Sequence, residues 1–201
     1  AAPSPIAAYA RQRGYPDPFQ SLPALCRRRR VPAARVPDLA GPEAVAAVVE
    51  AGVGLLVNAG GGLFREPLIG ACPAGILNAH MGPLPRVRGM NALEWSLLEG
   101  LPPTVTLHFV AAGIDTGDIL DCQPIPVEPG DTIAVLRQRY VPVAVELVAA
   151  QLAAVAAGTA ARQTQRAVEG RQYFALHPQL RRLAEARLRG RGPDPERAAA
   201  V

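Results

Sequence analysis

The sequence has few aromatic residues and few cysteines. The first shortage limits what can fill the core, and the second argues against cysteine-based frameworks. Aromatic residues make up 4% of the 201 residues, so leucine, valine, isoleucine and alanine must fill the core. The cysteines, Cys26, Cys72 and Cys122, are widely spaced and form no CxxC pair. This pattern argues against a disulfide framework and a structural zinc site. Free thiols instead predict a reducing, cytoplasmic compartment.

Long apolar runs and strong charge are also missing. No uninterrupted apolar run reaches the ~18 residues that cross a bilayer, and no signal peptide is visible, so a membrane partner is not expected. The net charge of +4 is mild, from 21 basic and 17 acidic residues. Its excess lies at Arg27–Arg30 and in 181–197, where aromatic residues do not interleave with the arginines. These runs predict solvated surface, and nucleic acid is not an expected partner.

Apolar runs bounded by glycine and proline predict strands near 53–58, 75–80, 104–110 and 119–127, the last at a sheet edge because prolines interrupt it. Helices are predicted between them and over the stretch from 132 to 157. This alternation is typical of an α/β fold with a mostly parallel sheet flanked by helices. Residues 1–158 are interpreted as a catalytic domain. Residues 159–201 are interpreted as a C-terminal extension with a short strand and a basic helix.

Three polar residues form the most informative constellation. Asn78 and His80 are two residues apart at the C-terminal end of a predicted strand, so their side chains point to the same face. In open α/β sheets, ligands bind at the C-terminal ends of the strands. Asp115 follows about 35 residues later in a loop bounded by glycines. A histidine with its ordinary pKa of about 6.5 can carry a proton, and an asparagine N–H can stabilise an oxyanion by roughly 3 kcal/mol. Asp115 can orient His80 and stabilise its charge. No nucleophile stands beside a partner base, which favours direct acyl transfer to an amine.

Plainer interpretations exist for each of these residues and for their neighbours. His80 alone could be a core histidine, while His108 and Thr106 on the next strand are expected to be supporting or structural. Asp115, Asp118 and Asp121 do not match the spacing of a calcium loop, so no metal site is expected. The triple glycine at 60–62 lacks the lysine of a phosphate-binding loop and is interpreted as a loop that a ligand can approach. Trp95 is expected to anchor the core.

Four motifs occur in an order that resembles the folate-dependent formyltransferases, which act on glycinamide ribonucleotide, methionyl-tRNA or sugar amines. The motifs are Asn78-Ala79-His80, Pro83-Leu84-Pro85 with Arg88-Gly89, Thr106-Leu107-His108, and Asp115-Thr116-Gly117. Together they span about residues 50–130. Each motif alone would be a weak signal, whereas the four in order are a strong one.

This resemblance implies a Rossmann-like domain that uses 10-formyltetrahydrofolate as formyl donor. It implies that Asn78, His80 and Asp115 carry catalysis. It also implies a pterin pocket formed by two loops, with Gly62, Leu63, Phe64, Ala111, Gly113, Ile114 and Thr116. The expected partner is a small-molecule amine, a nucleotide sugar included, because the roughly 40 residues after Gly158 are too few for a separate tRNA-binding β-barrel. A homo-oligomer is left open.

The sequence also departs from the family pattern. It lacks the opening strand, glycine loop and helix of the family, and the chain starts at Ala1 rather than at methionine, so an N-terminal truncation is expected. Gly82-Pro83 stands where many members have Ser-Leu, which predicts a different loop path. Two alternative functions follow: a weakly catalytic folate-binding or scaffold domain, and a hydrolase that releases formate from formyl-folate.

Overall fold

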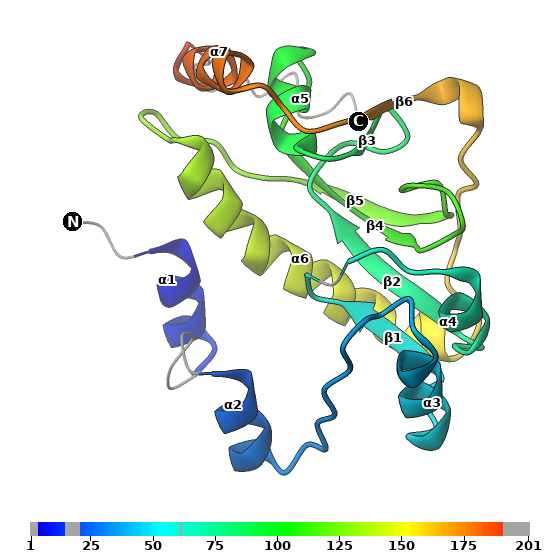
Figure 1. Cartoon of the computed structure of the whole chain (residues 1–201). Coiled ribbons are helices and arrows are strands. Elements are labelled where there is room, and N and C mark those ends of the chain that lie inside the picture. Colours follow the sequence, from blue (N-terminus) through cyan, green and yellow to red (C-terminus); the bar gives the residue numbers. More distant parts are fainter. Residues whose placement is uncertain (1–3, 15–20, 61, 191–201) are drawn as a thin grey trace.

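A central sheet with helices on both faces organises the protein, as seen in a computed structural model that describes residues 4–14, 21–60 and 62–190 (Figure 1). The sheet has four strands in the order β1 (Leu55–Asn58), β2 (Gly75–His80), β4 (Thr104–Phe109) and β5 (Ile119–Pro124). All four lie within or overlap the predicted strand regions, and β5 is at the predicted edge. The α/β class is therefore confirmed.

The sheet is mixed, which corrects the prediction of a mostly parallel one. β1 pairs with β2 in parallel, whereas β2 with β4 and β4 with β5 are antiparallel. An apolar run predicts that a strand forms but says nothing about the direction of its neighbour. Helix α4 (Glu66–Gly70) provides the crossover between β1 and β2, while only a loop joins β4 to β5, and a loop suits antiparallel neighbours.

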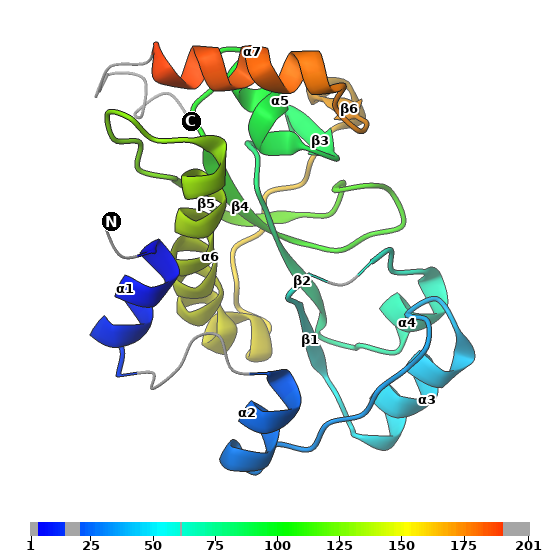
Figure 2. The same ribbon diagram turned by 60° about the vertical axis from the view of Figure 1, so that its left-hand side comes forward.

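The alternation of side chains along β2 builds two separate cores. Leu77 belongs to the larger cluster, which includes Leu107 on β4 and Leu136 on helix α6 (Ile133–Ala156). Ile76, one residue earlier, points to the other face and packs with Leu68 of α4 and with Cys72. Helices α4 and α3 (Pro42–Glu50) thus cover one face of the sheet and α6 covers the other (Figure 2).

Two further helices, α1 (Pro5–Gln12) and α2 (Leu22–Arg29), precede the sheet. Residues 31–36, between α2 and α3, are irregular chain. Within residues 4–14 and 21–54 no strand precedes β1.

Helix α6 qualifies by length and composition as a membrane span, the one such helix in the described residues, although the sequence has no uninterrupted apolar run of that length. Its buried residues nevertheless pack on the sheet: Ile133, Leu136, Ala144, Leu147 and Val155. A single helix of this length and composition is weak evidence for a membrane.

The segment after α6 returns to the domain and fastens to it. Its strand β6 (Arg171–Tyr173) pairs in parallel with β3 (Val87–Gly89), and its helix α7 (Pro178–Arg189) packs on α5 (Ala92–Leu98). Trp95 of α5 does not anchor the core as predicted. Its ring lies 4.7 Å from that of Tyr173, and its Nε1 donates to the Phe174 carbonyl at 3.0 Å, because β6 runs past α5. The division at residue 158 stays a prediction, and part of the proposed extension, 191–201, lies outside the described residues.

Candidate functional site

A row of polar side chains crosses three strands on one face of the sheet. The register pairs Asn58 of β1 with Asn78 of β2, and Asn78 with His108 of β4. Directly paired residues share a face, so their side chains meet. Asn58 Nδ2 donates to Asn78 Oδ1 at 2.9 Å, and Asn78 Nδ2 lies 3.0 Å from His108 Nε2. Strand pairing therefore holds the Asn78 amide in one orientation.

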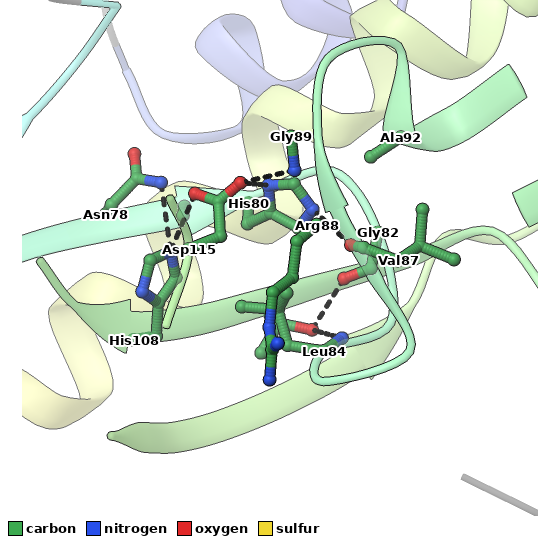
Figure 3. A network of polar contacts seen from close by, with 12 residues as sticks. Asn78, His80, Gly82, Leu84, Val87, Arg88, Gly89, Ala92, His108 and Asp115 are labelled. Atoms are coloured by element: carbon green, nitrogen blue, oxygen red, sulfur yellow. Dashed lines mark hydrogen bonds and ion pairs between the residues drawn. The ribbon is translucent and has the colours of Figure 1, made fainter. Parts of the chain in front are cut away.

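Asp115 completes the group from the loop that follows β4, and its carboxylate lies between the two imidazole rings (Figure 3). Its Oδ2 is 3.4 Å from His80 Nδ1, and its Oδ1 is 3.6 Å from His108 Nε2. Oδ2 also accepts a hydrogen bond of 2.7 Å from the Gly89 N–H. The structure thus brings together Asn78, His80 and Asp115, the three residues singled out in the sequence.

The two ring nitrogens of His80 have different partners. Nε2 is 2.8 Å from the Val87 carbonyl, an acceptor, so this nitrogen carries a hydrogen. Nδ1 then has a lone pair directed at Asp115 when the ring is neutral. A proton taken up between Nδ1 and Oδ2 would turn the two groups into a hydrogen-bonded ion pair. The backbone carbonyl of Val87 orients the ring, and Asp115 faces the nitrogen that can exchange a proton.

His108 is held neutral by its surroundings. Burial lowers the pKa of His108 to about 4, with nearby His80 acting in the same direction, while Asp115 and the Phe109 carbonyl oppose the shift. Nδ1 is 2.7 Å from the Phe109 carbonyl and must donate to it, so Nε2 accepts from Asn78. The supporting role expected for His108 agrees with this arrangement.

Thr106 is structural, as expected from its position beside His108. Its Oγ1 donates to the Gly82 carbonyl at 2.7 Å and accepts from the Leu84 N–H at 3.2 Å. These bonds fix the loop that follows His80 against β4.

A cavity of about 600 Å³ opens beside this group. Asn78, His80 and Asp115 line it, and so do six of the seven residues expected in the pterin pocket: Gly62, Leu63, Phe64, Ala111, Gly113 and Ile114. Thr116 does not line it; this side chain packs beneath Gly113, where an added Cβ would approach Thr116 Oγ1 to 2.6 Å. The volume suits a drug-sized or cofactor-sized ligand.

Sequence reasoning missed one wall of this cavity. Gln172, Tyr173 and Phe174, from the segment after α6, line it together with Gly89 and Met90. Gly89 permits the approach, because an added Cβ there would lie 2.2 Å from the Tyr173 carbonyl. The sequence predicted a short strand in the C-terminal extension but gave no sign of what that strand would contact. Asn58 was also missed, since a single asparagine at a strand end carries no distinctive pattern.

Large apolar side chains at this cavity remain exposed. Leu63, Met90 and Phe174 are 58%, 59% and 67% exposed. Exposed apolar groups gathered around a hollow mark a ligand or partner site. Within the described ranges, no three histidine, cysteine or acidic side chains are grouped in a way that could hold a metal ion.

The neutral state of His108 predicts a pH-dependent stability. The folded-state pKa of His108 is about 4, below its ordinary value of 6.5, so between these pH values the unfolded chain binds a proton that the folded chain does not. The contribution of His108 to the free energy of unfolding is complete above pH 6.5. It falls by roughly 3 kcal/mol as the pH is lowered toward 4. We expect His108→Gln to remove this part of the pH dependence in urea unfolding at pH 7 and pH 4.5.

His177→Gln is the matched control, because it makes the same substitution at an exposed position. His177 Nδ1 accepts from the Gln179 N–H at the start of α7, so the variant can be less stable overall, but the difference in its unfolding free energy between pH 7 and pH 4.5 should match that of the unmodified protein. If the His108→Gln and unmodified curves ran parallel instead, a neutral, buried His108 would be wrong.

Comparison with known proteins places this geometry in a family. Residues 18–152, more than half of the chain, match the family described as "Formyl transferase". The chain belongs to the formyl transferase family. The resemblance drawn from the four motifs is thereby confirmed.

Individual relatives support the same assignment. The methionyl-tRNA formyltransferase of Geotalea uraniireducens is 30% identical over 152 residues, which cover 73% of this chain and 49% of that protein. The glycinamide ribonucleotide transformylase 1 structure from Symbiobacterium toebii has a TM-score of 0.60 at 29% identity, covering 70% of this chain and 73% of that one. The formyltransferase PseJ of Anoxybacillus kamchatkensis was solved with UDP-4,6-dideoxy-4-formamido-L-AltNAc and tetrahydrofolate. Its TM-score is 0.52 at 21% identity, and the match covers 59% of this chain and 62% of that one. This last likeness shows the fold alone. The chain spans about half the length of the Geotalea enzyme.

Proposed function

We propose that this chain transfers a formyl group from 10-formyltetrahydrofolate to the primary amine of a small-molecule acceptor. The observation that carries the proposal is the His80 Nδ1 to Asp115 Oδ2 pair, 3.4 Å apart, beside Asn78 in a cavity of about 600 Å³. Membership of the formyl transferase family supports the reaction class. The three free cysteines fit a cytoplasmic location.

The roles of the three residues follow from their contacts. The formyl-folate supplies an acyl group on a nitrogen that can depart. One N–H of Asn78 is used by His108, and the second can stabilise the formyl oxygen as negative charge develops on it. The His80–Asp115 pair can take the proton from the attacking amine and return it to the departing folate nitrogen. The new C–N bond forms first and leaves an oxyanion on the formyl carbon, the carbonyl re-forms as the old C–N bond breaks, and no net proton is gained or lost.

The folate is proposed to lie between the loops at 62–64 and 111–116. Leu63 and Ile114 offer apolar contacts for the faces of the pterin ring, and nearby backbone groups can pair with its edge. The acceptor would then enter along the wall of Gln172, Tyr173 and Phe174. A nucleotide sugar is one candidate acceptor, since PseJ was solved with a UDP-linked formamido sugar.

Folate binding gives a direct test of this placement. Calorimetric titration with 5-formyltetrahydrofolate, a stable analogue, should give a measurable Kd, and Leu63→Ser should weaken it by about tenfold through loss of apolar contact. Leu183→Ser is the control, because Leu183 is an exposed leucine of α7 that does not line the cavity. Equal affinities of both variants, or no heat at millimolar ligand, would contradict the placement.

The reaction itself is tested by formyl-folate turnover against a panel of small amines, with His80→Ala as the inactive reference. Formamide product that depends on an amine supports the proposal. Formate release without any amine would instead identify the hydrolase. Folate binding without either product would identify a binding or scaffold domain.

A further inference from the structure

Gln165, from the segment after α6, ties down the loop that carries Asp115. Its Nε2 donates to the Asp115 carbonyl at 3.0 Å and to the Gly117 carbonyl at 2.6 Å. Both amide hydrogens of Gln165 are therefore directed at the backbone on either side of Thr116. No pattern in the sequence near position 165 predicted this contact, which joins residues 50 positions apart.

Arg88 holds Gln165 from the opposite side. The Gln165 Oε1 accepts from Arg88 Nε at 3.3 Å and from Arg88 Nη2 at 3.2 Å, and Nη2 also donates to the Arg166 carbonyl at 3.2 Å. Arg88 is only 6% exposed and stands next to Gly89, whose N–H donates to Asp115 Oδ2 (Figure 3). One connected set of bonds thus reaches both the backbone and the carboxylate of Asp115.

The backbone of Asp115 needs such support. Its φ of 50° is in the left-handed region, which a residue with a side chain adopts at a cost and keeps only when its surroundings hold it. Gly117 presses the same loop against β4, where an added Cβ would lie 1.9 Å from the Phe109 carbonyl. The loop is therefore held between β4 on one side and Gln165 on the other.

We propose that Gln165, oriented by Arg88, is a positioning residue that keeps the Asp115 carboxylate beside Gly89 and His80. The kinetic part of this inference rests on the proposed function, whereas the geometric part does not. Without the two donors of Gln165, the loop can relax toward an ordinary backbone conformation. Asp115 Oδ2 would then move away from the Gly89 N–H and from His80 Nδ1.

The test uses Gln165→Met, which keeps the size of the side chain and removes both donors. Gln163→Met is the matched control, because Gln163 is exposed on the same segment and uses its backbone to bond Ile119. Gln165→Glu is a second variant: it can still accept from Arg88 but, when ionised, cannot donate to the two carbonyls. It also supplies the measurement if the methionine variant does not fold.

The first readout is the Gly89 amide in the ¹⁵N–¹H spectrum and its hydrogen-exchange rate. We expect the Gly89 resonance to shift and its exchange to accelerate by at least tenfold in both Gln165 variants and not in Gln163→Met. The second readout is kinetic: kcat should fall by about 10- to 100-fold, as misplacement of a catalytic group does, and by a larger factor than the folate Kd rises, because Asp115 moves most within the loop. A purely structural role would lower stability without this division between kcat and Kd.

The two readouts separate failure of this inference from failure of the proposed function. An unchanged Gly89 amide in a folded Gln165 variant would overturn the positioning role, whatever the activity. A changed Gly89 amide with no formyl transfer by the unmodified protein would support the positioning role and contradict the proposed function. Equal kcat values in an active protein with a displaced Gly89 amide would overturn the kinetic part.

Discussion

Replacing His80 with alanine is expected to lower kcat for formyl transfer by about 100-fold or more, in line with the contribution of a general acid–base group. The substitution removes the Nδ1 atom that lies 3.4 Å from Asp115 Oδ2. No other side chain takes over, because His108 is neutral, with a pKa of about 4, and its Nε2 already accepts from Asn78. Steady-state kinetics with a separate folate Kd measure the effect.

Asp115→Ala should lower kcat by a similar factor, because it removes the carboxylate that shares a proton with His80. The double variant His80→Ala, Asp115→Ala should lose much less than the product of the two single losses, because the residues act as a unit. His177→Ala is the control for a histidine substitution at an exposed position. Near-normal turnover in His80→Ala, or strictly multiplicative losses, would rule out a shared proton.

Asn78→Ala is expected to lower kcat by about 100- to 1000-fold while the folate Kd changes little. The hydrogen bond from Asn78 to the formyl oxygen strengthens mainly in the transition state, and losses of this size follow removal of one such donor. Asn78→Asp sharpens the test, because it keeps an oxygen for the Asn58 donor but has no N–H. Its kcat should be at least as low as that of the alanine variant.

Asn58→Ala distinguishes donation from orientation. It removes the N–H that holds Asn78 Oδ1 at 2.9 Å but leaves the Asn78 amide in place. We expect a smaller fall in kcat than for Asn78→Ala.

If Asn78→Ala weakened folate binding as strongly as it lowered kcat, Asn78 would be a binding residue rather than a stabiliser of the oxyanion.

Local sequence patterns determined the elements and the family. Apolar runs bounded by glycine and proline located β1, β2 and β4, and the prolines after Ile119 placed β5 at an edge. The spacing of Asn78 and His80 predicted that both reach one cavity, and both do. These predictions held because they depend on neighbouring residues, whose backbone geometry is set by periodicity and by turn chemistry.

The tertiary structure alone decided how distant parts meet. The antiparallel pairing of β2 with β4 sets His108 opposite Asn78, and nothing in either strand states the direction or register of its partner. The left-handed backbone of Asp115, the hold of Gln165 on its carbonyl and the cavity wall at 172–174 also depend on contacts across many residues of chain. Such contacts arise from the packing of the whole domain, where many weak interactions sum, so no local window of sequence contains them.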